Sequence, residues 1–184
     1  MMCKRFGVAM LWSMALSAVV CAQVMMLCMC TVAYGQENLI PNGGFESEGL
    51  GTPAGWSGLW AREPGKITVS LDGRASHSGR QSLKAQHTGQ QDWSLSAGGR
   101  LQVTTGELFT LAAWGQFKGT GSSSLGIVTY DRDNQVLEWF FVAGRAPASS
   151  DWGCVRIPFA IGPGVASIQP RITGEASAII SIIT

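Results

Sequence analysis

Cysteine and histidine are scarce in this chain of 184 residues, which has five cysteines and two histidines. Four of the cysteines lie within the first 30 residues, and Cys154 is the only one after them. An internal disulfide is therefore excluded for the rest of the chain, and a small buried thiol is a commoner role for Cys154 than a nucleophile. His77 and His87 have no cysteine or acid at ligand spacing, which argues against a histidine-based metal site.

Charge is sparse as well, with 13 basic and 12 acidic residues and a formal net charge of +1. Lys4 and Arg5 are the only charged residues among the first 35, so the remainder has 11 basic and 12 acidic residues and a net charge of −1. A surface with this balance has no general attraction for nucleic acid or anionic lipid. We therefore expect no nucleic-acid partner.

The start of the chain has the pattern of a targeting segment. A short basic start precedes an uncharged apolar run over residues 6–33, and Ala33 and Gly35 are small residues at the spacing of a cleavage site. This pattern predicts a signal peptide over residues 1–35 and a secreted or cell-surface protein. The alternative is an uncleaved membrane anchor, because roughly 20 apolar residues are enough to span a bilayer; a membrane partner is expected only in that case.

Residues 36–184 have the length of a single domain that can bury its own core. No stretch there shows a convincing helical period; short runs alternate between apolar and polar residues, with Gly, Asp, Asn or Ser clusters between them. This pattern predicts an all-β, antiparallel β-sandwich of the jelly-roll type with about eight or nine strands, the first around residues 39–40. The clearest alternating runs are 66–73, 81–88, 92–103, 107–119, 123–144, 151–164 and 166–175.

The end of the chain, "SAIISIIT", is an apolar and β-branched run without polar alternation. It predicts a strand buried on both faces. Such a strand would promote aggregation if it were left unpaired at a sheet edge.

Six motifs occur in a fixed order: "NLIPNGGFE…PAGW", "ASHSGRQSLKAQ", "GELFTLAAWGQFKG", "DRDNQVLEWFFV", "DWGCVRIPFAI" and "ASIQPRITGE". This series, over residues 38–175, resembles the carbohydrate-binding modules of the xylan- and cellulose-binding type within the galactose-binding-like superfamily. The resemblance implies a β-sandwich and a polysaccharide or oligosaccharide ligand. In the first motif, Phe45 is expected in the core with Trp56 packing at one end of the sandwich, while Glu46 points away.

The resemblance also bears on metal binding. In relatives, the Glu of the first motif and an Asp of the last strand help to hold a structural calcium ion. Glu46 is present here, but residues 175–184 contain no aspartate. Calcium takes about six to eight oxygen ligands, so Glu46 would depend on backbone carbonyls. A structural Ca²⁺ at Glu46 is thus in doubt, and no other cofactor is expected.

The sequence does not offer the residues of an active site. A glycosidase needs two carboxylates that face each other across its substrate, and most acids here fall at turns or strand ends. There is no recognisable Ser-His-Asp context, and "GTGSSS" lacks the strand-to-helix setting of a phosphate-binding loop. We therefore predict a protein without catalytic activity.

Six tryptophans lie beyond residue 35, and flat aromatic rings stack on the apolar faces of sugars. In the run 107–119, Phe109, Leu111 and Ala113 occupy the core positions, so Trp114 is expected on the outer face. Gln116 shares that outer parity, and the same reasoning places Gln169 and Arg171 outward because Ile168 and Ile172 point inward. If these strands belong to one sheet, they form a stacking platform with hydrogen-bond donors. The alternative is a Trp114 that is covered by a loop and only packs.

Three other tryptophans are harder to place. Trp139 lies in "VLEWFFVAG", where both parities are apolar, so it is either buried or lines a groove. Trp60 and Trp93 are expected in or beside loops at a rim. The predicted carbohydrate-binding residues are therefore Trp114, Gln116, Trp139, Gln169, Arg171, Trp60 and Trp93.

Two functions fit this sequence. The first is a secreted, non-catalytic carbohydrate-binding module that stacks polysaccharide on exposed aromatic rings. The second is a cell-surface adhesion or assembly module that binds protein or acts as a spacer, because the same fold serves such roles. The sequence indicates neither the sugar nor the oligomeric state.

Overall fold

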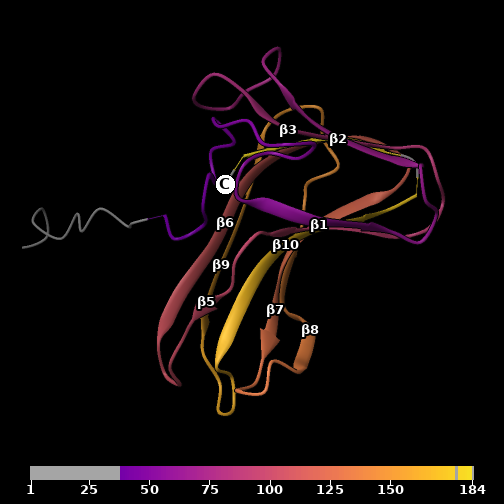
Figure 1. Cartoon of the computed structure of the whole chain (residues 1–184). Helices are drawn as coiled ribbons and strands as arrows, with labels where there is room; N and C mark the ends of the chain where they lie inside the picture. The colour runs from indigo at the N-terminus through magenta and orange to yellow at the C-terminus, as the bar shows by residue number, and fades with distance from the viewer. Residues whose placement is uncertain (1–37, 177, 184) are drawn as a thin grey trace, which may run out of the picture. The chain divides into compact units, whose positions relative to one another are not determined.

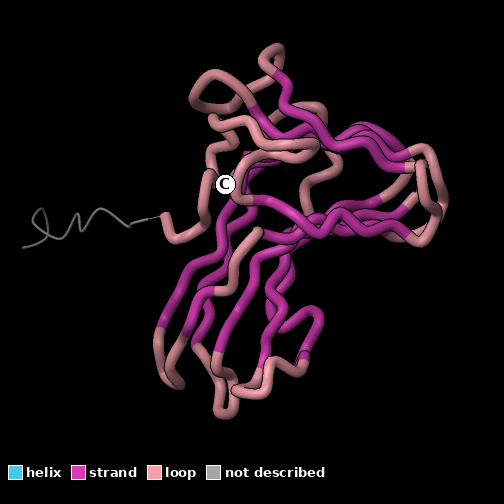
Figure 2. Tube along the Cα trace, viewed as in Figure 1, coloured by secondary structure: helices cyan, strands magenta, loops and turns pink. Residues whose placement is uncertain are grey.

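The computed structural model describes residues 38–176 and 178–183, and the signal peptide predicted for residues 1–35 lies outside them (Figure 1). The strands and loops belong to one compact unit, Asn38–Thr184. Its described residues include no helix, and so none that could cross a membrane (Figure 2).

Two antiparallel sheets build this unit. The first sheet has the order β1-β4-β10-β7-β8, with the short β5 paired to β10, and the second has the order β2-β3-β11-β6-β9. The strands of the first sheet are β1 (Trp56–Ala61), β4 (Trp93–Ala97), β5 (Leu101–Gln102), β7 (Ser122–Tyr130), β8 (Val136–Arg145) and β10 (Ser167–Glu175). Those of the second sheet are β2 (Ile67–Asp72), β3 (Ser82–His87), β6 (Leu108–Gly119), β9 (Gly153–Ala160) and β11 (Ala178–Ile183).

The core lies between the inner faces of these sheets, as the alternating runs predict. Leu95 and Ile172 of the first sheet are fully buried, and so are Leu83 and Ile180 of the second. Period-two strands with one apolar face pack in this way because alternate side chains point to opposite sides of a sheet. The predicted antiparallel β-sandwich is confirmed.

The first motif is a loop and not the predicted strand at residues 39–40. Residues 40–44 form bends and turns, and Asn42 and Phe45 have φ angles of 49° and 56° in the left-handed region. The Asn42 amide donates to the carbonyl oxygens of Ser47 at 2.9 Å and Ala54 at 2.8 Å, which ties the loop together. Asparagine tolerates this conformation better than most residues, and its side-chain bonds replace those of a sheet.

This loop delivers its aromatic ring to the core. Phe45 is fully buried, and its ring centroid lies 5.1 Å from that of Trp56, which is 3% exposed. The predicted core positions of Phe45 and Trp56 are therefore confirmed. The described residues form eleven strands, and not eight or nine, because β1 forms where a loop was expected and because the predicted run 92–103 divides into β4 and the two-residue β5.

β11 is an interior strand of the second sheet and pairs with β3 on one side and β6 on the other. Ala178, Ile180 and Ile182 face the core, whereas Ile179 is 40% exposed. The apolar run is thus a strand, as predicted, and its outer face is covered in part, because Ser181 is buried while Ile179 is exposed. Pairing on both edges removes the aggregation risk of an open edge.

Candidate functional site

A bulge in β1 turns one tryptophan inward and another outward. Trp56 pairs with Ala97, but the register shifts by one residue before Trp60 pairs with Ser94. Trp56 and Trp60 would share a face in a regular strand; one extra residue reverses the parity. Trp56 is therefore in the core, and Trp60 is 47% exposed on the outer face of the first sheet.

A larger irregularity in β8 exposes two neighbouring rings. Thr129 of β7 pairs with Glu138, whereas Ile127 pairs with Val142, so three residues of β8 oppose a single residue of β7. Trp139 and Phe140 both face outward as a result, with exposed fractions of 59% and 54%. The apolar residues of this strand thus lie on two faces. Trp139 and Phe140 are on the outer face, whereas Phe141 and Val142 pack against the core.

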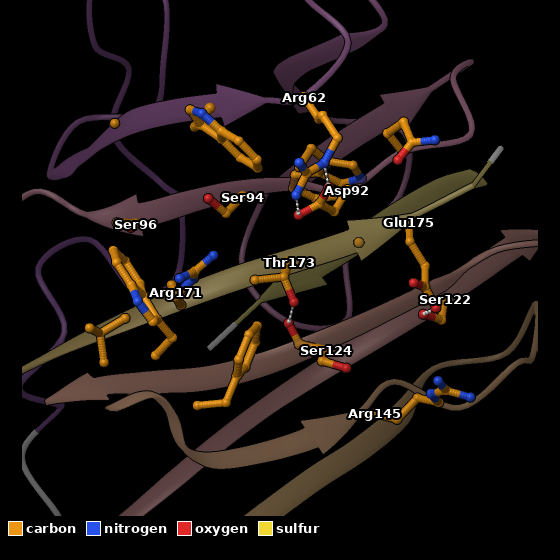
Figure 3. A pocket seen from close by; sticks show the side chains of 18 of the residues that line it. Arg62, Asp92, Ser94, Ser96, Ser122, Ser124, Arg145, Arg171, Thr173 and Glu175 are labelled. Carbon is orange, nitrogen blue, oxygen red and sulfur yellow. Dashed lines mark hydrogen bonds and ion pairs between the residues drawn. The ribbon is translucent and has the colours of Figure 1, made fainter. Parts of the chain in front are cut away.

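These rings border a cleft of about 1020 Å³ on the outer face of the first sheet. Trp60 stands on the edge strand β1, and Trp139 and Phe140 stand on the opposite edge strand β8. Ser94 and Ser96 of β4 lie across from Thr173 and Arg171 of β10, which gives a floor of small hydroxyl-bearing side chains and one guanidinium (Figure 3). Such a cleft offers apolar rings at its borders and hydrogen-bonding groups between them.

Most charged side chains of the cleft form an ion pair or a hydrogen bond with another residue of the cleft. Arg62 donates from Nε to Asp92 Oδ1 at 2.6 Å, and this bond lowers the pKa of Asp92 and raises that of Arg62 (Figure 3). At the other end, the Ser122 hydroxyl donates to Glu175 Oε1 at 2.9 Å. Arg171 differs, because burial lowers its pKa and no ion pair joins it to any acid among the described residues.

Gln169 points to the outer side, as predicted, but its amide is engaged within the protein. Its Oε1 accepts from the Tyr130 hydroxyl at 2.8 Å, and its Nε2 donates to the Ala97 carbonyl oxygen at 2.7 Å. The Tyr130 ring lines the cleft and has the Arg100 guanidinium carbon 3.4 Å from its centroid. Gln169 therefore fixes Tyr130, and Tyr130 is the residue that lines the cleft.

The predicted platform of Trp114 and Gln116 with Gln169 and Arg171 is wrong. β6, which carries the first pair, belongs to the second sheet, while β10 belongs to the first. The predicted outward parity of Trp114 is confirmed by its exposure of 39%. The loop between β2 and β3 covers part of its indole, as in the alternative, because the His77 ring of this loop stacks on it at a centroid distance of 3.9 Å.

The prediction of Trp93 at an exposed rim is also wrong. Trp93 opens β4 with its side chain toward the core, and it is 1% exposed. Its indole lies against Gly174, where an added Cβ would come within 2.6 Å of the indole Nε1. Trp93 cannot offer a ring face to a sugar.

The setting of Glu46 does not fit a calcium ion. Its Oε1 accepts from the backbone amides of Arg80 at 2.8 Å and Gln81 at 3.3 Å, and its Oε2 accepts from the Arg80 guanidinium at 3.1 Å. Both carboxylate oxygens of Glu46 thus accept hydrogen bonds, one of them from a positively charged group. A calcium ion would need these oxygens to be free as ligands. No group of three or more His, Cys, Asp or Glu residues within the described part could hold a metal ion.

Glu46 instead makes stability depend on pH. The backbone bond from Arg80, which is the largest cause, holds the pKa of Glu46 below its ordinary value of 4.5. A depressed carboxylate pKa stabilises the fold above pH 4.5, and the stabilisation is lost as the pH falls through the folded-state pKa. Glu46→Gln should therefore lower the melting temperature near pH 7, with a difference from the wild type that shrinks as the pH falls below 4.5. Glu48→Gln, an exposed neighbour, is the control and should keep the wild-type melting temperature near pH 7. A constant difference for Glu46→Gln would contradict this role.

Comparison with known proteins shows likeness at the level of the fold. No family model matches the sequence, and no curated protein does so. The enzymatically active domain of tailspike protein 4 from bacteriophage CBA120 superposes with a TM-score of 0.59 at 14% identity, covering 79% of this chain and 20% of the phage chain. A family 16 carbohydrate-binding module has a TM-score of 0.54 at 17% identity, covering 80% of this chain and 96% of the module. A family 61 module, solved in complex with β-1,4-galactotriose, has a TM-score of 0.55 at 16% identity over 80% of this chain and 94% of its own. The resemblance that the motifs suggested is thus confirmed as a shared carbohydrate-binding-module fold.

Proposed function

We propose that this chain is a non-catalytic polysaccharide-binding module whose ligand lies in the cleft of the first sheet. The observation that carries the proposal is the exposure of Trp60, Trp139 and Phe140 around a floor of serine, threonine and arginine side chains. Sugar rings stack their apolar faces on aromatic rings while their hydroxyls bond to polar neighbours. The likeness to modules that are named as carbohydrate-binding supports the same reading.

The acids of the cleft support a binding role over a hydrolytic one. A glycosidase needs a carboxylic acid with a raised pKa to protonate its leaving group. Asp92 is ion-paired to Arg62, which lowers its pKa, so it does not suit that task. Glu175, the other acid of the cleft, is bonded to Ser122 and lies on β10, two strands from β1.

Export forms part of the proposal, because a protein that binds an extracellular polysaccharide must leave the cell. The basic start and apolar run of residues 1–35 support it. Mass spectrometry of the exported protein should find an N-terminus at Gln36. An intact residue 1 would contradict cleavage and favour the membrane anchor.

Titration calorimetry with soluble xylan, β-glucan, mannan and galactan tests the binding role and its location. Trp139→Ala should weaken binding of the preferred glycan by roughly 1–3 kcal/mol, the range for stacking on an aromatic ring. Trp114→Ala removes an exposed ring from the other sheet and should leave that affinity unchanged. A larger effect of Trp114→Ala would place the ligand on the second sheet. No heat with any glycan would remove the proposal and favour an adhesion or spacer module.

A further inference from the structure

Arg171 holds a charge for which the described residues supply no counter-ion. It lies near the middle of β10, between β4 and β7, and its guanidinium lines the cleft. Its Nε is sealed from solvent and has no hydrogen-bond partner among the described residues. An N–H of a charged group that loses its water without gaining a hydrogen bond is costly for the fold.

The surroundings of Arg171 hold the guanidinium in place without neutralising it. Its central carbon lies 5.5 Å from the Trp139 ring centroid and 5.1 Å from that of Phe140. Gly126 is its partner on β7, so no side chain from that position occupies the space beside it. Aromatic rings attract a cation but do not supply the directed acceptors that a guanidinium fork needs.

The rest of the cleft does not supply an anion for Arg171. Asp92 favours the charged form of Arg171 through space, but the Asp92 carboxylate is bonded to Arg62. Glu175 lies four residues after Arg171 on β10, and its carboxylate accepts a hydrogen bond from Ser122. The lining contains three arginines, Arg62, Arg145 and Arg171, against these two acids, which leaves a net positive charge.

We propose that the cleft takes a polysaccharide whose sugar units carry an anionic substituent, a carboxylate or a sulfate ester, and that Arg171 receives this group. The inference rests on the proposed function and names its ligand class. Arginine binds carboxylate and sulfate-like groups through two parallel N–H donors, and bonds between charged partners are roughly twice as strong as neutral ones. The sugar ring that bears the group lies against Trp139, beside the guanidinium.

The test compares each anionic polymer with a form of the same backbone whose anionic group is reduced, esterified or removed. Glucuronoxylan is matched with its carboxyl-reduced form, polygalacturonate with its methyl ester, and a sulfated galactan with its desulfated form. Calorimetric titration of the wild-type protein should show at least a tenfold preference for the charged member of at least one pair. The preference should fall as salt is raised, because ions screen the attraction. The carboxylate pairs and the sulfate pair distinguish the two anion sources.

Variants at Arg171 connect this preference to one side chain. Arg171→Met keeps the apolar stem and should abolish the preference, whereas Arg171→Lys keeps the charge without the fork and should retain part of it. Arg74→Met removes an exposed arginine outside the cleft and should behave like the wild type. If Arg171→Met does not fold, as judged by melting, the matched pairs and Arg171→Lys still decide.

Three results would count against the inference, and they fall differently on the proposed function. Equal binding of charged and uncharged members overturns the inference while the binding function stands. A preference that survives Arg171→Met also overturns it, because another group then receives the anion. If no polymer of any kind binds, the proposed function fails together with the inference.

Discussion

Replacing both Trp60 and Trp139 by alanine is expected to weaken the binding of a long oligosaccharide by roughly 2–6 kcal/mol, twice the range for one stacked ring. The two rings stand on β1 and β8, the opposite edges of the first sheet. Four inter-strand spacings of about 4.8 Å place these edges about 19 Å apart along the sheet. Groups this far apart contact different sugar units, and their contributions should add.

The length of the ligand provides the sharper test. With a disaccharide, which cannot reach both rings, the double variant should bind no more weakly than the weaker single variant. With longer oligosaccharides, the losses of Trp60→Ala and Trp139→Ala should sum to that of the double variant. Unchanged melting temperatures would show that all three variants fold. Losses that fail to add with long ligands would mean that the two rings do not act on one bound chain.

Trp93→Ala is expected to cost about 3–5 kcal/mol of the free energy of unfolding, as for other large buried aromatic residues. The side chain is 1% exposed and packs against Gly174 of the neighbouring strand. A loss of this size is a large part of the roughly 5–15 kcal/mol that stabilises a typical domain. Chemical denaturation monitored by circular dichroism measures it.

Trp93→Phe separates ring packing from the indole N–H. The Nε1 of Trp93 is buried without a hydrogen-bond partner among the described residues, so a phenyl ring loses volume but no hydrogen bond. This variant should be clearly more stable than Trp93→Ala and should keep its glycan affinity. If Trp93→Ala instead melted like the wild type but bound glycan weakly, the ring would belong to the binding site after all.

Side-chain parity could be predicted wherever a strand keeps a regular register. Phe109, Leu111 and Ala113 do face the core, and Trp114 does face outward, because β6 pairs with β9 without interruption. The same rule on β10 correctly placed Arg171 outward. A strand that alternates in sequence carries this information locally.

The composition of the site could not be predicted, because it depends on the bulges and on strand order. One extra residue in β1 brings Trp60 to the cleft, and the irregularity of β8 adds Phe140, which sequence reasoning did not select. The one signal in the sequence was the stretch "WFFV", where both parities are apolar. The pairing of distant strands also decided that Trp114 and Arg171 lie in different sheets, and no local pattern reports this.

The interior position of β11 has a consequence for the order of events during synthesis. β3 and β6 do not pair with each other, and residues 178–183 are the strand that joins them. Until the ribosome has added these residues, the second sheet consists of two separate halves, β2-β3 and β6-β9, which each leave an open edge. A domain of this topology cannot complete its fold piece by piece from the N-terminus. It must wait for β11, and such long-range pairing is intrinsically slow.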